Sequence, residues 1–148
     1  MDWAVMFLSR DGRIARREFW FGFALVMIVS VIANLLPGWG KAVGFLALYA
    51  QVSLFAQRLH DMGRTAWLMA IPWGVVLLCT VGAVMTGVAG ASDATFTLAL
   101  ALTVLAIVVG WGFVIWVGTA KGTPGPNRFG EPLPRIRAEM TERARKAG

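Results

Sequence analysis

The feature that most constrains this chain is residues 66–119, a stretch of 54 residues with one charged side chain, Asp93. A single helix of that length would extend about 80 Å, whereas the hydrocarbon core of a bilayer is only about 30 Å thick. The stretch must therefore turn once. The break is supplied by Gly87, Gly90, Ser92 and Asp93, and either Ser92 or Asp93 can cap the helix that follows. We expect two membrane-spanning helices here, at residues 66–88 and 95–119.

Two further segments are free of charge, residues 19–36 and residues 42–57, and a turn that contains Pro37 and Gly38 separates them. The chain is 57% hydrophobic and 15% charged, whereas a soluble domain is about 25% charged. Because the outer connections are short, neighbouring helices should be antiparallel. The sequence predicts an all-α membrane protein with four transmembrane helices arranged in two antiparallel hairpins.

The Lys and Arg side chains are divided very unequally between the two sides of this topology. One side carries only Lys41, and the other carries the remaining thirteen of the fourteen. An excess of Lys and Arg marks the cytoplasmic side of a membrane protein. We therefore expect both termini to be cytoplasmic, in a multi-pass membrane protein. The thirteen are Arg10, Arg13, Arg16, Arg17, Arg58, Arg64, Lys121, Arg128, Arg135, Arg137, Arg143, Arg145 and Lys146.

The two ends of the chain have their own character. Before the first span, Trp3, Met6 and Phe7 recur at helical spacing, which predicts a short helix in the cytoplasmic interface. Residues 1–132 should form one four-helix transmembrane domain, and residues 133–148 a basic cytoplasmic tail on the inner leaflet. The formal net charge is +6, but topology alone accounts for the cations, so no nucleic-acid partner is expected.

Three motifs lie at the predicted cytoplasmic ends of the spans. They are GRIARREFW at residues 12–20, RLHDMG at residues 58–63 and GTPGPNRFGEP at residues 122–132. Together they resemble the DUF805 family of small bacterial inner-membrane proteins. The chain departs from that pattern at Ala15, where the family often has Ser, and at Gln57, where a second Arg is common. The family has no established activity, so the resemblance implies fold and location but no mechanism.

Catalysis finds little support in the sequence. His60 is the only histidine, and no second His, Cys or carboxylate stands at metal-ligand spacing. Ser53 shares its helical face but is two turns away, about 10 Å along the axis, which is beyond hydrogen-bond reach. We therefore expect no catalytic residue, no metal and no cofactor, and we rank an enzyme last among the function classes.

Transport is the alternative function that the sequence leaves open, as a small oligomeric transporter or channel. Proton-coupled carriers usually hold an ionisable residue within the membrane, and the predicted spans have none. Their polar residues, including Asn34, Gln51 and Ser53, more often join helices than line a pathway. Small residues on the spans would also permit copies of the chain to associate.

The favoured function is a non-enzymatic binding module with a polar site at the cytoplasmic face. Cations outnumber acids there, which suits an anion, a phosphate-bearing lipid headgroup or a protein partner. The simpler interpretation is that the arginines only set topology and pair with nearby acids. The identity of the ligand stays open. The candidate residues are Arg13, Arg16, Arg17, Arg58, His60, Asp61, Arg64, Asn127 and Arg128.

The candidate residues come from separate motifs, which must converge if they form one site. Arg58 and Asp61 are three residues apart at a helix end, a spacing that permits an ion pair. Phe129 is apolar in a polar, turn-rich segment and needs a place to be buried. We therefore expect residues 122–132 to fold back, with Phe129 beside the other motifs. Asn127 and Arg128 should then lie near Arg13, Arg58 and Asp61.

Overall fold

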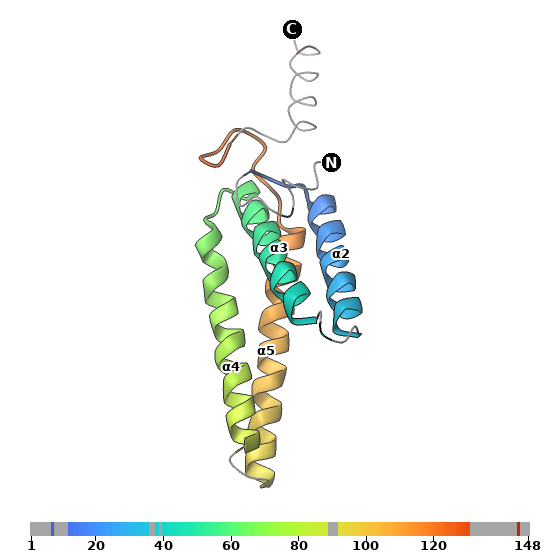
Figure 1. Cartoon of the computed structure of the whole chain (residues 1–148). Coiled ribbons are helices and arrows are strands. Elements are labelled where there is room, and N and C mark those ends of the chain that lie inside the picture. Colours follow the sequence, from blue (N-terminus) through green and yellow to red (C-terminus); the bar gives the residue numbers. More distant parts are fainter. Residues whose placement is uncertain are drawn as a thin grey trace. The chain divides into compact units, whose positions relative to one another are not determined.

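The structure is a computed structural model that describes residues 7, 12–35, 38, 40–88, 92–130 and 145. Its four long helices are α2 (Arg16–Leu35), α3 (Gly40–Asp61), α4 (Ala70–Val88) and α5 (Asp93–Thr119), and the short 3-10 helix η1 (Ala66–Met69) precedes α4 (Figure 1). Within the described residues there is no strand, only an isolated bridge between Asn127 and Gly130. All four predicted spans are confirmed as helices that are long and apolar enough to cross a membrane.

The helices begin where the sequence supplies a cap. Asp93 opens α5, and Ser92 Oγ accepts a hydrogen bond from the Thr95 N–H (3.2 Å) while Thr95 Oγ1 accepts one from the Ser92 N–H (3.0 Å). At the start of α2, the Glu18 carboxylate accepts a hydrogen bond from the Ala15 N–H (3.0 Å). This is half of a capping box, because Ala15 has no hydroxyl to complete it.

The chain divides into two compact units, one made of residues 1–66 and 118–148 and the other of residues 67–117. In the first unit α2 packs against α3 over an aromatic core. Phe19 and Phe55 are fully buried, with ring centroids 5.3 Å apart in an edge-to-face arrangement, and Phe23 adds a second edge-to-face contact to Phe55. Such aromatic pairs add specific geometry to the packing of apolar area.

The last two residues of α5, Gly118 and Thr119, also belong to the first unit. A Cβ built at Gly118 would lie 2.5 Å from the Trp20 ring, so the absence of a side chain lets the ring lie on the helix backbone. This contact fixes where the chain leaves α5, and hence where the segment that follows begins.

In the second unit α4 and α5 lie side by side (Figure 1). A Cβ at Gly82 would approach Leu102 Cδ1 to 3.0 Å, and one at Gly110 would lie 3.6 Å from Val76 Cγ2. Small residues at such positions permit close helix approach in a membrane.

Several predictions are not tested by these helices. The arrangement in two hairpins, the cytoplasmic placement of both ends and the single domain at residues 1–132 stay predictions. The predicted interfacial helix lies outside the described residues except for Phe7, and so does the tail at residues 133–148 except for Arg145.

Candidate functional site

The site begins at the end of α3, which terminates in a defined C-cap. The Gly63 N–H donates to the His60 carbonyl and the Arg64 N–H donates to the Leu59 carbonyl, both at 2.9 Å. This is the Schellman pattern, which needs a residue with positive φ, and Gly63 has φ +71°. The glycine of the RLHDMG motif therefore stops the helix one turn after Arg58 and leaves Asp61 at its last position.

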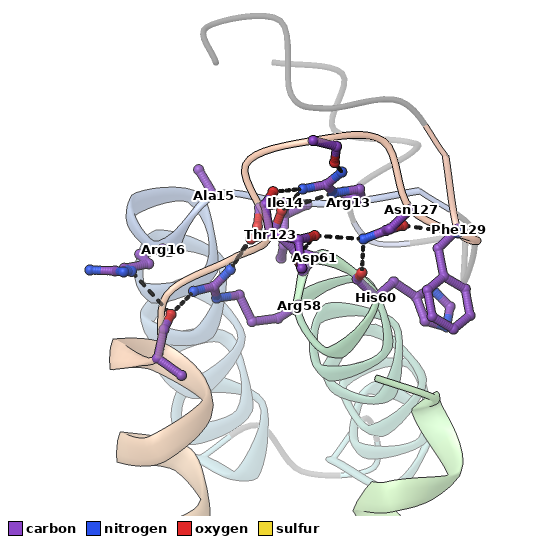
Figure 2. Close-up of polar contacts among 12 residues, drawn as sticks. Arg13, Ile14, Ala15, Arg16, Arg58, His60, Asp61, Thr123, Asn127 and Phe129 are labelled. Carbon is purple, nitrogen blue, oxygen red and sulfur yellow. Dashed lines mark hydrogen bonds and ion pairs between the residues drawn. The ribbon is translucent and has the colours of Figure 1, made fainter. Parts of the chain in front are cut away.

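Asp61 is the centre of a buried ion-pair network (Figure 2). Its carboxylate accepts a hydrogen bond from Arg13 Nε (3.0 Å) and a second from the guanidinium of Arg58. The side chains of all three residues are at most 4% exposed. The predicted pair between Arg58 and Asp61 is confirmed, and Arg13, in the segment before α2, pairs with the same carboxylate. Two buried cations share one buried carboxylate, which leaves a formal excess of one positive charge.

Residues 120–130, which we name the strap, fold back over this network. The Thr123 N–H and hydroxyl donate to the Asp61 carbonyl at 2.8 and 2.9 Å, and Asn127 Nδ2 donates to the His60 carbonyl at 2.9 Å. Phe129 stacks on the His60 ring, with centroids 4.0 Å apart and planes 11° apart. The predicted fold-back and the predicted contact of Phe129 are therefore confirmed.

The arginines hold the strap through its backbone carbonyls. Arg13 donates to the carbonyls of Thr123 and Gly125, the latter at 2.9 Å. Arg58 and Arg16 both donate to the Ala120 carbonyl, Arg16 through Nε at 3.1 Å. The first residues after α5 are thus fixed to the start of α2 and the end of α3 at once (Figure 2).

Beside this network lies an open pocket of about 430 Å³. Four cationic side chains and one carboxylate line it, so the formal charge of its lining is +3. Two of the cations, Arg16 and Arg17, are exposed residues in the first turn of α2, and Lys121 is an exposed residue of the strap. Its lining residues are Ala15, Arg16, Arg17, Arg58, Asp61, Lys121 and Gly122.

Not every candidate residue from the sequence reaches the pocket. Arg13 is buried and donates to a strap carbonyl. Asn127 also holds the strap in place, because it donates to the His60 carbonyl. Arg64 is exposed after the end of α3. The expectation that Arg128 would approach Arg58 and Asp61 was wrong, because its guanidinium lies over the Phe129 ring, 4.7 Å from the centroid. A ring that is already stacked on one face offers the other to a cation.

Sequence reasoning missed three contributors to the site. Lys121 was counted only as a topology signal, although it lines the pocket. Gly122 lies directly on the Asp61 carboxylate, where any Cβ would overlap the carboxylate oxygens. The Ala120 carbonyl joins two arginines. Only Lys121 carried a readable signal, as the first cation after a long apolar span.

Among the described residues no group of three His, Cys, Asp or Glu side chains is placed to hold a metal ion. Several hydroxyls within the spans bond to their own helices. Ser53 Oγ donates to the Tyr49 carbonyl (3.1 Å), and Thr80 Oγ1 donates to the Val76 carbonyl (2.7 Å).

Comparison with known proteins agrees with this architecture. The family described as "Protein of unknown function (DUF805)" matches residues 7–131, which include the ion-pair network and the whole strap. The chain belongs to the DUF805 family. The DUF805 match thus covers the first two motifs and all of the third except Pro132.

Two curated relatives of this DUF805 chain come from Escherichia coli. Inner membrane protein YhaH is 27% identical over 152 residues, which cover 92% of this chain and 98% of YhaH. Uncharacterized protein YiiR is 32% identical over 133 residues, which cover 83% and 84% of the two chains. No solved structure matches the chain. The four apolar helices and the relation to YhaH identify a multi-pass protein of the bacterial inner membrane.

Proposed function

We propose that this protein is a non-enzymatic membrane module whose basic pocket binds a phosphate group. The single observation that carries the proposal is the pocket beside the start of α2, with a lining of formal charge +3. Arginine and lysine form charge-assisted hydrogen bonds with phosphate oxygens, which are stronger than bonds between neutral partners. A phosphate in the pocket would offset the excess of positive charge that the lining now carries.

The arginines differ in whether they are bonded within the protein or exposed on the pocket, and this difference supports the proposal. Arg13 and Arg58 are engaged by Asp61 and by strap carbonyls. Arg17 and Lys121 are exposed on the pocket, where a ligand can reach them without breaking that network. The ligand-binding residues should therefore be Arg16, Arg17 and Lys121, with Arg58 at the base.

The depth of the pocket favours a phosphate that belongs to a lipid. Arg16 and Arg17 occupy the first turn of a membrane-spanning helix, and Trp20 follows one turn later. Tryptophan is enriched at the level of the headgroups. A phospholipid headgroup and a free phosphate offer the same chemistry, so the experiment must separate the two sources.

The alternative function, a small transporter or channel, receives no support from the polar residues of the spans. Ser30 Oγ donates to the Val26 carbonyl, and Asn34 Nδ2 donates to the Ser30 carbonyl, both at 2.7 Å. Side chains that bond to their own helix are arranged for packing in an apolar setting.

The test is a calorimetric titration of the purified protein in a neutral detergent. Short-chain phosphatidylglycerol, short-chain phosphatidylcholine and inorganic phosphate are the three ligands. We expect phosphatidylglycerol to bind, and Arg17→Gln to weaken its binding about tenfold, the effect of losing one charge-assisted hydrogen bond. Competition by inorganic phosphate at similar concentration would identify a free anion as the ligand instead.

The matched control is Lys41→Gln, which removes the same charge from an exposed residue at the other end of α3. It should leave the affinity within about twofold of the parent, since screened charges at that distance contribute little. Equal losses in both variants would show nonspecific attraction to a basic protein. An Arg17→Gln protein that binds like the parent would overturn the proposal.

A further inference from the structure

The pocket is built from parts that are distant in the sequence. Arg16 and Arg17 come from α2, Arg58 and Asp61 come from α3, and Lys121 and Gly122 come from the strap. Without the strap the pocket loses one wall and one of its four cations. The pocket is therefore complete only when the strap is docked on the end of α3.

Several of the polar contacts that dock the strap lie outside the pocket. Asn127 Nδ2 donates to the His60 carbonyl (2.9 Å) and to Thr123 Oγ1 (2.8 Å). Thr123 in turn bonds to the Asp61 carbonyl through both its N–H and its hydroxyl. Asn127 is uncharged and does not line the pocket, so it acts there only by holding the strap in place.

Docking also has an electrostatic cost that an anion would reduce. The strap takes part in covering Arg13 and Arg58, whose side chains are 2% and 1% exposed, and Asp61 neutralises only one of them. Burying a charge that lacks a full counter-charge is unfavourable. An anion in the adjoining pocket, next to Arg58, supplies the missing negative charge and favours the docked strap.

We propose that anion binding in the pocket and docking of the strap are thermodynamically coupled, so that a bound anion favours the docked strap. This inference rests on the proposed function. Linkage requires reciprocity: if the docked strap raises the affinity for an anion, the anion must stabilise the docked strap by the same factor.

The first test uses Asn127→Ala against Lys41→Gln. Asn127→Ala leaves every lining residue and the net charge intact, and it should weaken phosphatidylglycerol binding about fivefold, the effect of one or two lost hydrogen bonds. Lys41→Gln is the control, because it removes a charge from an exposed residue at the other end of α3, outside both the strap and the pocket. It should change the affinity less than about twofold.

The second test needs no variant. Hydrogen exchange of the Thr123 amide, which bonds to the Asp61 carbonyl at 2.8 Å, is measured in the parent protein with and without saturating phosphatidylglycerol. Exchange should slow severalfold with the lipid, and a Ser92 amide in the other unit should not change. Phosphatidylcholine, added in the same amount, should leave both rates unaltered.

The outcomes separate the two proposals. The coupling is overturned if Arg17→Gln weakens binding while Asn127→Ala does not, or if bound lipid leaves the Thr123 exchange rate unchanged. In either case the proposal that the pocket binds a phosphate group is retained. If the parent protein binds no phosphate-bearing ligand, both fall. Slower Thr123 exchange together with an Asn127→Ala defect establishes the coupling.

Discussion

The two compact units of this protein handle polar groups in opposite ways. In the first unit, Arg13, Arg58 and Asp61 are buried and bond across segments that are far apart in the sequence. In the second unit, Thr80, Thr97 and Thr103 are exposed and bond to carbonyls of their own helices. The first unit has own-helix bonds as well, at Ser30 and Ser53, but its buried polar contacts also fix tertiary structure. The three threonines of the second unit satisfy carbonyls of their own helices.

Burial of the helices follows the same division. Within the most apolar stretch of α3, 39% of the residues are buried, whereas within that of α5 only 6% are buried. The difference indicates which unit carries the site: a network of buried charges needs a protein environment around it, and a helix surface open to hydrocarbon cannot provide that. Changes to polar residues should therefore matter most in the first unit.

The largest effect should come from Asp61→Asn. Removing this carboxylate leaves Arg13 and Arg58 buried without a counter-charge, at a cost of about 3–5 kcal/mol in the free energy of unfolding. The measurement is thermal unfolding in detergent. The control is Asp93→Asn, an exposed carboxylate in the first turn of α5, which should cost no more than about 0.5–1 kcal/mol. Equal melting temperatures for the two variants would contradict the expectation that polar residues of the first unit contribute more to stability than those of the second.

Gly122→Ala should have the next largest effect. A Cβ at Gly122 would overlap the Asp61 carboxylate, so the strap backbone must shift, at a cost of about 1–3 kcal/mol. Gly125→Ala is the matched control in the same strap, because a Cβ there meets no atom within 4 Å. Accessibility of a cysteine placed at position 124 reports undocking directly. Similar labelling rates in both variants would show that the close approach at Gly122 does not hold the strap.

The smallest effect should come from the second unit, where Ser92→Ala removes the cap of α5. The lost hydrogen bond to the Thr95 N–H should cost about 1 kcal/mol in stability. It should leave lipid binding unchanged, since Ser92 lies in the unit that does not contain the site. Thr103→Ala, which loses only a bond to its own helix, is the control and should be neutral within about 0.5 kcal/mol. A binding defect in Ser92→Ala would mean that the two units do not act separately.

Much of the fold could be predicted from the sequence, because a bilayer imposes a simple rule on charged residues. The spans, and a cap at Ser92 or Asp93, followed from where charges and helix breakers lie. Helical spacing was enough to pair Arg58 with Asp61, and the apolar character of Phe129 in a polar segment was enough to predict the fold-back. Each of these signals is carried by a side chain whose type is visible in the sequence.

The rest of the site depends on the backbone and could not be predicted. The Ala120 carbonyl joins Arg16 to Arg58, and any residue at that position has the same carbonyl. Gly122 was seen only as a turn residue, because its contact with Asp61 depends on the path of the strap. Arg128 was misplaced for the same reason: its neighbour Asn127 does face the network, but the turn that follows directs Arg128 over the Phe129 ring.

The proposed function requires that the basic pocket beside the strap hold a phosphate group. An experimental structure of the protein in nanodiscs that contain phosphatidylglycerol would show this directly. We expect phosphate density in the pocket, within about 2.7–2.9 Å of donors on Arg17 or Lys121, with the strap docked on Asp61. Lipid headgroups resolved elsewhere around the helices, with none in this pocket, would contradict it.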